Sequence, residues 1–337
     1  MRELRSYFKI RQRLREILSV VLVIVCAGAI SAVQQKPVKE SSRTSVTQST
    51  SSNTNRIQQV IVNTDLVTLN VTVIDHRGFA VLGLEKKDFT ITDNKFAQQI
   101  TFFSDADLPL SVGMVFDVSG SMKGNKIERA REALTNFIQT SHPDDEYFLI
   151  GFNSQPELLM DRSRDGDAIT KKLSLVEPRD STALYDATYL ALERVSRGSH
   201  AKRAIVIISD GQDNSSRYTF SQLRRALKES DVLVYAVGIQ APTPGDVLDF
   251  FGKMLLSELA VSSGGRAFFP ANSTALTEAL ETIALELRHQ YSIGYRPSNF
   301  KVDGKWHRIK VKVTPPANLK RVFVRSREGY YAVASSP

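Results

Sequence analysis

The stretch Ser111-Val-Gly-Met-Val-Phe-Asp-Val-Ser-Gly-Ser121 decides the fold. It begins as a short apolar run without polar alternation, which is typical of a strand buried on both faces of a sheet. It ends in three oxygen-bearing side chains spaced two residues apart, Asp117, Ser119 and Ser121. Because alternate residues of an extended segment point the same way, these three are expected to share one side. The stretch therefore predicts a buried parallel strand with polar groups at its carboxyl end.

Similar apolar runs follow further along the chain, and amphipathic segments separate them. The runs are residues 147–152, 204–208 and 232–239. The segments whose apolar residues recur at helical spacing are 127–138, 184–195, 223–227 and 276–287, the last after a cap at Asn272 or Ser273. Buried strands alternating with helices indicate a sheet covered on both faces. We expect residues 108–290 to be an α/β domain with a doubly wound, mostly parallel sheet.

Three loops are expected to meet at one edge of this sheet, because ligands of open α/β sheets bind at the carboxyl ends of the strands. Asp117, Ser119 and Ser121 follow the first strand, Asp210 follows residues 204–208, and Thr182 precedes the helix that leads back to that strand. These five side chains offer only carboxylate and hydroxyl oxygens. Such donors suit a small hard cation, Mg²⁺ or Mn²⁺, and the lack of soft donors disfavours zinc or copper.

Asp117-Val-Ser-Gly-Ser121, Thr182 and Ser209-Asp210-Gly211 together resemble the metal ion-dependent adhesion site (MIDAS) of von Willebrand factor type A (VWA) domains. The wider architecture resembles bacterial VWFA-related domain proteins of unassigned function. The resemblance implies that Ser119, Ser121 and Thr182 are hydroxyl ligands, and that Asp117 and Asp210 act mainly through water. It also implies that an Asp or Glu of a partner protein completes the metal shell.

One position departs from the family pattern. Where the family often has Gly-Gly-Thr, this chain has Asp180-Ser181-Thr182. Asp180 adds negative charge near the site, which either raises metal affinity or repels an acidic partner. Asp213, just after Gly211, is a second candidate for a residue that supports the metal ligands without touching the ion, although a solvated loop aspartate is the plainer interpretation.

Two β segments flank the α/β domain, at residues 57–107 and 291–337. Alternating, β-branched runs predict strands at residues 60–62, 66–74, 89–93 and 99–103 in the first segment, and at 291–295, 306–313, 322–325 and 330–333 in the second. Each segment is thin for an independent core. We therefore expect one discontinuous β-sandwich with the α/β domain inserted; the alternative is two separate satellites packed on that domain.

The amino terminus reads as a targeting segment. Basic residues up to Arg15 precede an apolar run, residues 17–32, that contains small residues such as Ala27, Ala29 and Ala32. This pattern is typical of a secretory signal peptide at residues 1–32, with an uncleaved membrane anchor as the alternative. A Ser/Thr-rich linker, residues 33–56, follows and is expected to be disordered. Either way we expect export, to the periplasm, the cell envelope or the extracellular space.

The composition excludes several function classes. The chain has 337 residues, 42% hydrophobic and 24% charged, with 44 basic and 36 acidic residues giving +8. Six basic and two acidic residues lie in the first 32, so the rest carries only 8 − 4 = +4. This modest surplus gives little support for nucleic-acid binding. The single cysteine, Cys26, excludes a disulfide framework and a cysteine-ligated zinc site.

Enzyme motifs are missing from the sequence. None of the five histidines forms H-E-x-x-H, and no glycine-rich segment forms a phosphate-binding loop. We therefore expect a binding protein and not an enzyme, one that captures an acidic residue of a partner through the metal. Two alternatives stay open: a structural component of an envelope assembly in which the metal only stabilises the fold, and a metal-dependent hydrolase.

Overall fold

The computed structural model describes residues 66–179, 181–239, 247–298, 302–315, 319 and 321–332, all within one compact unit. The predicted targeting segment 1–32, the linker 33–56, the predicted strand at residues 60–62 and Asp180 lie outside the described residues. In the described part of the chain, no helix combines the length and the apolar character that a membrane span requires.

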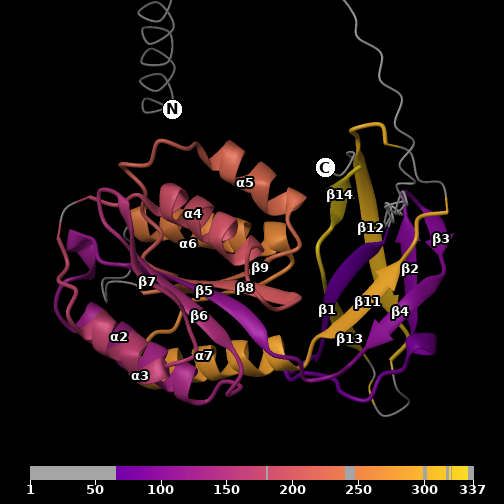
Figure 1. Ribbon diagram of the computed structural model, residues 1–337, viewed down its shortest axis with the longest axis horizontal. Helices are drawn as coiled ribbons and strands as arrows, with labels where there is room; N and C mark the ends of the chain where they lie inside the picture. The colour runs from indigo at the N-terminus through magenta and orange to yellow at the C-terminus, as the bar shows by residue number, and fades with distance from the viewer. Residues whose placement is uncertain are drawn as a thin grey trace, which may run out of the picture. The chain divides into compact units, whose positions relative to one another are not determined.

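Six of the described strands form one sheet in the order β10-β9-β8-β5-β6-β7 (Figure 1). They are β5 (Leu110–Asp117), β6 (Glu146–Phe152), β7 (Pro156–Ser163), β8 (Lys202–Ser209), β9 (Leu233–Gly238) and β10 (Ala267–Phe268). All neighbours run parallel except β6 and β7. The predicted mostly parallel sheet is therefore confirmed, and its central strands are buried because helices cover both faces.

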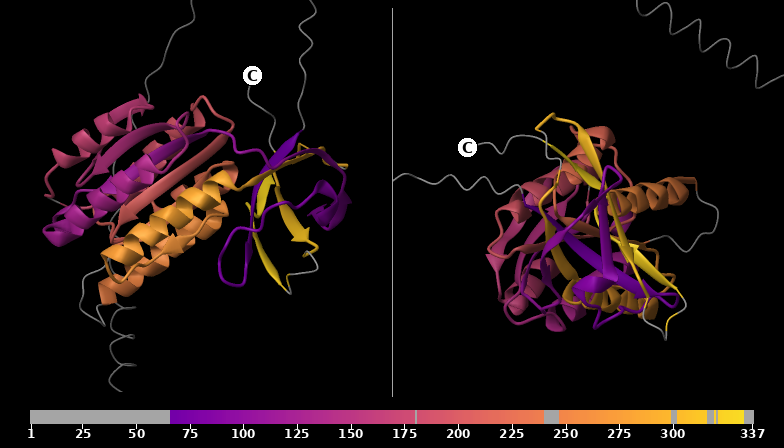
Figure 2. Two further views of the ribbon diagram at one scale, coloured as in Figure 1. Left: turned by 90° about the horizontal axis from the view of Figure 1, so that it is seen from below. Right: turned by 90° about the vertical axis from the view of Figure 1, so that its right-hand side faces the viewer.

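Helices cover the two faces of this sheet in two layers (Figures 1 and 2). One layer holds α2 (Asn125–Gln139), α3 (Gly166–Ser174) and α7 (Ser273–Arg288), and the other holds α4 (Leu184–Ser196), α5 (Phe220–Glu229) and α6 (Val247–Ser263). Side chains alternate along each strand, so Met114 of β5 packs in the first core and Val115 in the second. The expected doubly wound arrangement is thus present.

The strands before and after the α/β domain pair with each other in two antiparallel sheets, β13-β1-β11-β4 and β14-β12-β2-β3. The strands are β1 (Val67–Asp75), β2 (Phe89–Asp93), β3 (Phe96–Gln98), β4 (Ile100–Ser104), β11 (Tyr291–Tyr295), β12 (Trp306–Val313), β13 (Val322–Arg325) and β14 (Gly329–Tyr331). A 3₁₀ turn, η1 (Lys86–Asp88), precedes β2.

A shared core joins the two sheets and includes Leu69 and Ile91 from the first segment and Ile293 and Ile309 from the second. The predicted pairing of the two segments is confirmed, and two separate satellites are excluded. The boundaries at residues 57–107, 108–290 and 291–337 remain our proposal for the domains.

A buried lysine holds together the two connections between the sandwich and the α/β domain. The Lys202 ammonium donates to the carbonyl oxygens of Ala106 at 3.0 Å and Gln290 at 3.4 Å. A second contact joins Arg325 of β13 to the buried Glu286 of α7 at 2.6 Å. Lys202 begins β8, so the sandwich is attached at the amino ends of the parallel strands. The carboxyl ends, where the predicted site lies, are at the opposite edge.

We predict that residues 57–104 expressed alone do not fold. In the whole chain β1 pairs with β11 and β13, and β2 pairs with β12. The isolated fragment lacks these partners and would expose side chains such as Leu69 and Val71, which are buried in the intact sandwich. Circular dichroism and thermal melting of the fragment, beside residues 57–337 as the control, check this. A cooperative melt of the fragment would contradict the proposed division.

Candidate functional site

Asp117 and Ser209 end the adjacent parallel strands β5 and β8, whose register sets Phe116 opposite Ile208. The two side chains meet there: the Ser209 hydroxyl donates to Asp117 Oδ2 at 2.5 Å. The Ser119 amide donates to Asp117 Oδ1 at 2.9 Å. Both oxygens of this fully buried carboxyl are therefore held in place by the backbone geometry of the sheet end.

Asp210 supplies a second buried carboxyl one residue beyond β8. Its Oδ1 accepts from the Gln212 amide at 3.3 Å. No hydrogen-bond donor of the described residues reaches the buried Oδ2. The Lys126 ammonium, in the first turn of α2, stands 3.8 Å from this oxygen, beyond hydrogen-bond distance. Asp210 Oδ2 is thus a buried acceptor without a hydrogen bond, and the nearby ammonium offsets its negative charge only in part.

The carboxyl group of Asp117 ionises less readily than a free carboxyl group. Burial, together with the negative charge of Asp210, raises the pKa of Asp117 to about 6, against the hydrogen bonds from Ser119 and Ser209. A carboxyl group that has lost water and faces a negative charge is costly to ionise. A divalent cation nearby would reverse this penalty.

Two serine hydroxyls lie next to the carboxyl groups in the turn after β5. Ser119 is buried and precedes the 3₁₀ turn η2 (Gly120–Met122), in which Ser121 is exposed. Their Oγ atoms stand 3.0 Å apart. The pair therefore places two hydroxyl oxygens side by side, one at the protein side of the site and one at the solvent side.

Backbone hydrogen bonds fix the loop that carries Thr182. The Arg179 amide donates to the Val118 carbonyl at 2.9 Å, which ties the loop to the end of β5. The Ala183 amide donates to the Asn153 carbonyl after β6 at 2.6 Å, and the Asn214 amide donates to the Thr182 carbonyl at 2.9 Å. Thr182 is buried at this junction. The three loops named from the sequence do converge at one edge of the sheet.

Asp213 takes a position at the start of α4. Its Oδ2 accepts from the Tyr185 amide at 3.0 Å and from the Ser216 hydroxyl at 2.6 Å. Burial raises the pKa of its carboxyl. These contacts cap the helix that follows Thr182 and so help to hold that loop. A supporting role at the metal site stays a prediction for Asp213, as for Asp180.

The structure gives two residues a place at the site that the sequence did not predict for them: Ser209, known from the sequence only as part of the motif, and Lys126. Ser209 binds Asp117, which only the register between β5 and β8 reveals. Lys126 faces Asp210 from the first turn of α2. Its position five residues after Ser121 was the available signal, but a lysine near a helix start is also common on a solvated surface.

The donor chemistry of the site fits a hard cation. Among the described residues no cluster of three or more His, Cys, Asp or Glu side chains could hold a metal, so hydroxyl oxygens must supply part of any shell here. Asp117, Ser119, Ser121, Thr182 and Asp210 offer oxygen only. Two carboxylates also leave a divalent ion with coordination positions for water and for a group from outside.

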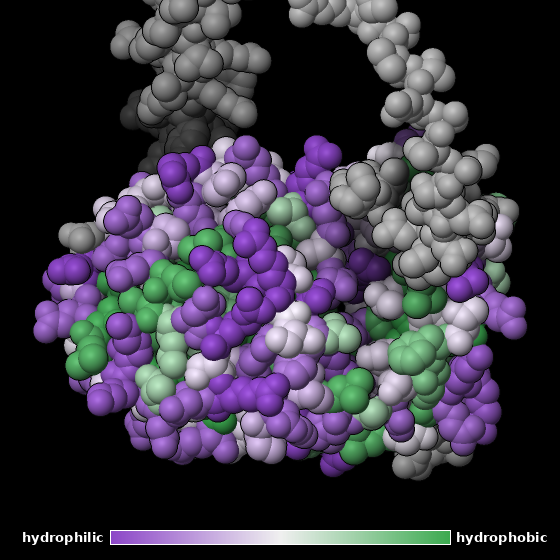
Figure 3. Space-filling model, viewed as in Figure 1, coloured by the Kyte–Doolittle hydropathy of each residue, from purple (hydrophilic) through white to green (hydrophobic). Residues whose placement is uncertain are grey.

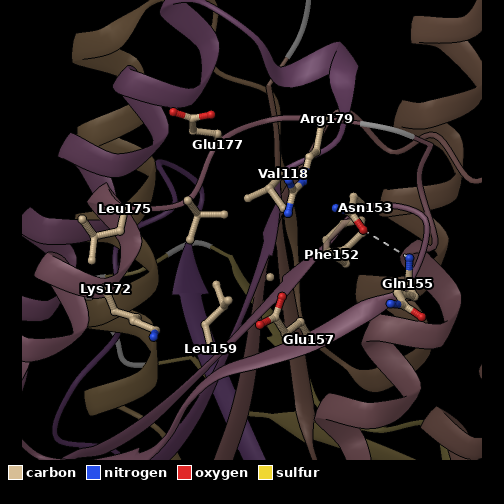
Figure 4. A pocket seen from close by; sticks show the side chains of 12 residues that line it. Val118, Phe152, Asn153, Gln155, Glu157, Leu159, Lys172, Leu175, Glu177 and Arg179 are labelled. Atoms are coloured by element: carbon tan, nitrogen blue, oxygen red, sulfur yellow. Dashed lines mark hydrogen bonds between the residues drawn. The ribbon is translucent and has the colours of Figure 1, made fainter.

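A hollow of about 310 Å³ lies next to this edge, between the turn after β5, the β6–β7 hairpin and the end of α3. Figure 4 shows Arg179 and Asn153 beside Val118 at one end of it, with Glu157 and Leu159 of β7 further along. On the face shown in Figure 3, apolar side chains gather on the β6–β7 side of the α/β domain. The edge that carries the carboxyl groups is therefore not flat.

Residues 112–212, which contain all five candidate ligands, match the family model of the von Willebrand factor type A domain. The chain contains a VWA domain. An uncharacterized protein from Synechocystis sp. is 23% identical over 194 residues, which are 56% of this chain and 44% of that protein. The chain thus spans less than half of that relative's length.

Two solved structures are also similar to part of this chain. An aerotolerance-related membrane protein from Bacteroides fragilis shares 19% identity with a TM-score of 0.45, covering 53% of this chain and 98% of its own. Proximal thread matrix protein 1 from the mussel byssus was solved with zinc in its MIDAS motif. It shares 18% identity with a TM-score of 0.46, covering 58% of this chain and 49% of its own.

We predict that Asp117→Asn removes a pH dependence of stability in metal-free VWA protein. With a pKa raised from 3.8 to about 6, the folded state binds the proton more tightly than the unfolded state. This group's contribution is therefore full below about pH 4 and is lost as pH rises through about 6, by about 3 kcal/mol at most. Urea unfolding in EDTA across this range should show a shallower loss for the variant; identical slopes would contradict the prediction.

We predict that Lys126→Met tightens binding of Mg²⁺ by about three- to tenfold. The ammonium 3.8 Å from Asp210 Oδ2 would repel a cation held by the same carboxylate. Isothermal titration calorimetry measures the change. Lys123→Met, an exposed position in the same segment, is the matched control and should have a smaller effect. Equal or weaker binding by Lys126→Met would show that this lysine does not oppose the ion.

Proposed function

We propose that this VWA domain captures an acidic side chain of a partner protein through a divalent cation. Asp117, Ser119, Ser121, Thr182 and Asp210 would hold the ion, directly or through water. The observation that carries the proposal is the buried carboxyl pair, in which Asp210 Oδ2 lacks a hydrogen-bond donor among the described residues and Asp117 has a raised pKa. A buried polar atom without a partner calls for an ion or a water.

The cation is proposed to be Mg²⁺ or Mn²⁺. All candidate ligands are oxygens, and small hard cations prefer oxygen ligands and keep several waters. Ser121 is exposed, so the solvent side of the site is open to a group from another molecule. A carboxylate from a partner is a natural group to fill an open coordination position, because small hard cations prefer oxygen ligands.

The positions of the histidines favour binding over catalysis. All five histidines lie within the described residues. His142 and His200 precede β6 and β8 and so lie at the opposite edge of the sheet, and His289, His307 and His76 belong to the α7–β11 connection and the sandwich. No imidazole can therefore act as a base for Ser119 or Ser121. We propose a non-enzymatic, exported protein, the export resting on the pattern of residues 1–32.

We predict that Ser121→Ala weakens binding of Mg²⁺ by about tenfold or more and that Asp117→Ala abolishes it. Ser121 is exposed, and among the described residues its hydroxyl has a hydrogen bond only with Ser119, so loss of the hydroxyl should not disturb folding. Ser154→Ala, an exposed serine in the loop after β6, is the matched control and should bind as the wild type does.

Calorimetry with Mg²⁺, Mn²⁺ and Zn²⁺ on the full chain provides the measurement. Absence of Mg²⁺ and Mn²⁺ binding by correctly folded protein would reject the proposal. Capture from a cell-envelope fraction then tests the partner: retention should need Mg²⁺, end on addition of EDTA and fail with Asp117→Ala. Retention that persists in EDTA would instead favour a structural role in an envelope assembly.

A further inference from the structure

The helix α6 leaves large apolar side chains in solvent beside the candidate metal site. Phe250 is 63% exposed, Phe251 54% and Met254 52%. Its other side is buried through Leu256, Leu259 and Ala260 in the core. Neighbouring apolar side chains exposed together on one helix mark a surface that binds something, whereas isolated ones need no explanation.

Part of this apolar surface forms one wall of a groove of about 660 Å³. Phe251, Met254 and Leu255 come from α6, and Tyr185 and Phe220 come from the starts of α4 and α5. The rings of Tyr185 and Phe220 lie 5.9 Å apart, centre to centre. The remaining wall is polar and consists of residues 211–214 with Glu258. The groove thus combines an aromatic lining with amide and carboxyl groups along one side.

The groove is continuous with the candidate metal site through two glycines. Gly211, which lines the groove, directly follows Asp210. A side chain at Gly211 would meet Gly252 O of α6 at 2.5 Å, and one at Gly252 would meet Asp210 O at 2.3 Å. The backbone of α6 therefore packs directly against the loop that carries Asp210. One partner chain could touch the ion and the groove within a few residues.

We infer that the groove accepts a bulky apolar side chain, such as Phe, Leu, Met or Trp, from the partner whose Asp or Glu binds the cation. The inference rests on the proposed function and narrows the partner to a protein segment in which an acidic and a large apolar residue lie close together. An acidic occupant is disfavoured in the groove, because Asp213 lines it and the other lining carboxylate, Glu258, is already paired with Arg224 at 2.8 Å. The apolar lining favours an occupant without charge.

A displayed random peptide library, bound to the full chain in Mg²⁺ and eluted with EDTA, tests this inference. We expect eluted peptides to carry Asp or Glu with a large apolar residue nearby. A synthetic peptide from this pool should bind Phe251→Ala about tenfold or more weakly than the wild type, since burial of a Phe side chain is lost. Phe250→Ala is the matched control: its ring is adjacent and similarly exposed but does not line the groove, so binding should hardly change.

The outcomes separate the inference from the proposed function. Acidic peptides without apolar enrichment, or equal binding to both phenylalanine variants, would overturn the inference and leave cation-mediated capture standing. A pool that EDTA does not elute would overturn both.

Two further results would overturn the inference by giving the groove another occupant. Metal-independent binding to phosphatidylglycerol vesicles that needs Phe250 as well as Phe251 would make the surface a membrane contact. Dimers in sedimentation that Phe251→Ala abolishes would assign the groove to a second copy. Mg²⁺ binding itself should be unchanged in both variants.

Discussion

The binding edge of this molecule is organised around two carboxyl groups buried at the ends of neighbouring strands. The parallel pairing of β5 and β8 brings Asp117 and Ser209 opposite each other and puts Asp210 one residue further on. Both acids are buried, and burial together with the charge of Asp210 raises the pKa of Asp117. A serine hydroxyl and backbone amides of the surrounding loops donate hydrogen bonds to these carboxyl groups, and the ammonium of Lys126 stands 3.8 Å from Asp210. These groups compensate only in part, which is why the edge is suited to a cation.

Much of this arrangement could be predicted from the sequence, because it depends on local patterns and one topological rule. Unbroken apolar runs identify buried parallel strands, and in open α/β sheets the carboxyl ends of such strands share one edge. Asp117, Thr182 and Asp210 could therefore be placed together although they are far apart in the chain. The sandwich followed from a size argument, since neither flanking segment could bury its own apolar face, and the pairing of β1 with β11 and β13 satisfies it.

Other features depend on contacts that no local pattern records. The strand β7 has neither regular alternation nor many β-branched residues, and the short helix α3 gives little periodicity, so neither was predicted. The helix α6 is apolar on most of its circumference, including its solvent side, so it shows no single apolar stripe. The Ser209–Asp117 bond and the approach of Lys126 to Asp210 need the sheet register and the path of the turn after β5. The close backbone contact between Gly211 and Gly252 likewise depends on the tertiary structure.

The insertion of the VWA domain between two sandwich strands has a mechanical consequence. The chain enters the VWA domain near Ala106 and leaves it near Gln290, and the Lys202 ammonium donates hydrogen bonds to the carbonyl oxygens of both residues. Tension applied along the polypeptide at residue 66 loads β1 and its antiparallel neighbours first. While those strands stay paired, a pull between residues 66 and 332 bypasses the α/β sheet, because both of its connections return to the same place beside the sandwich.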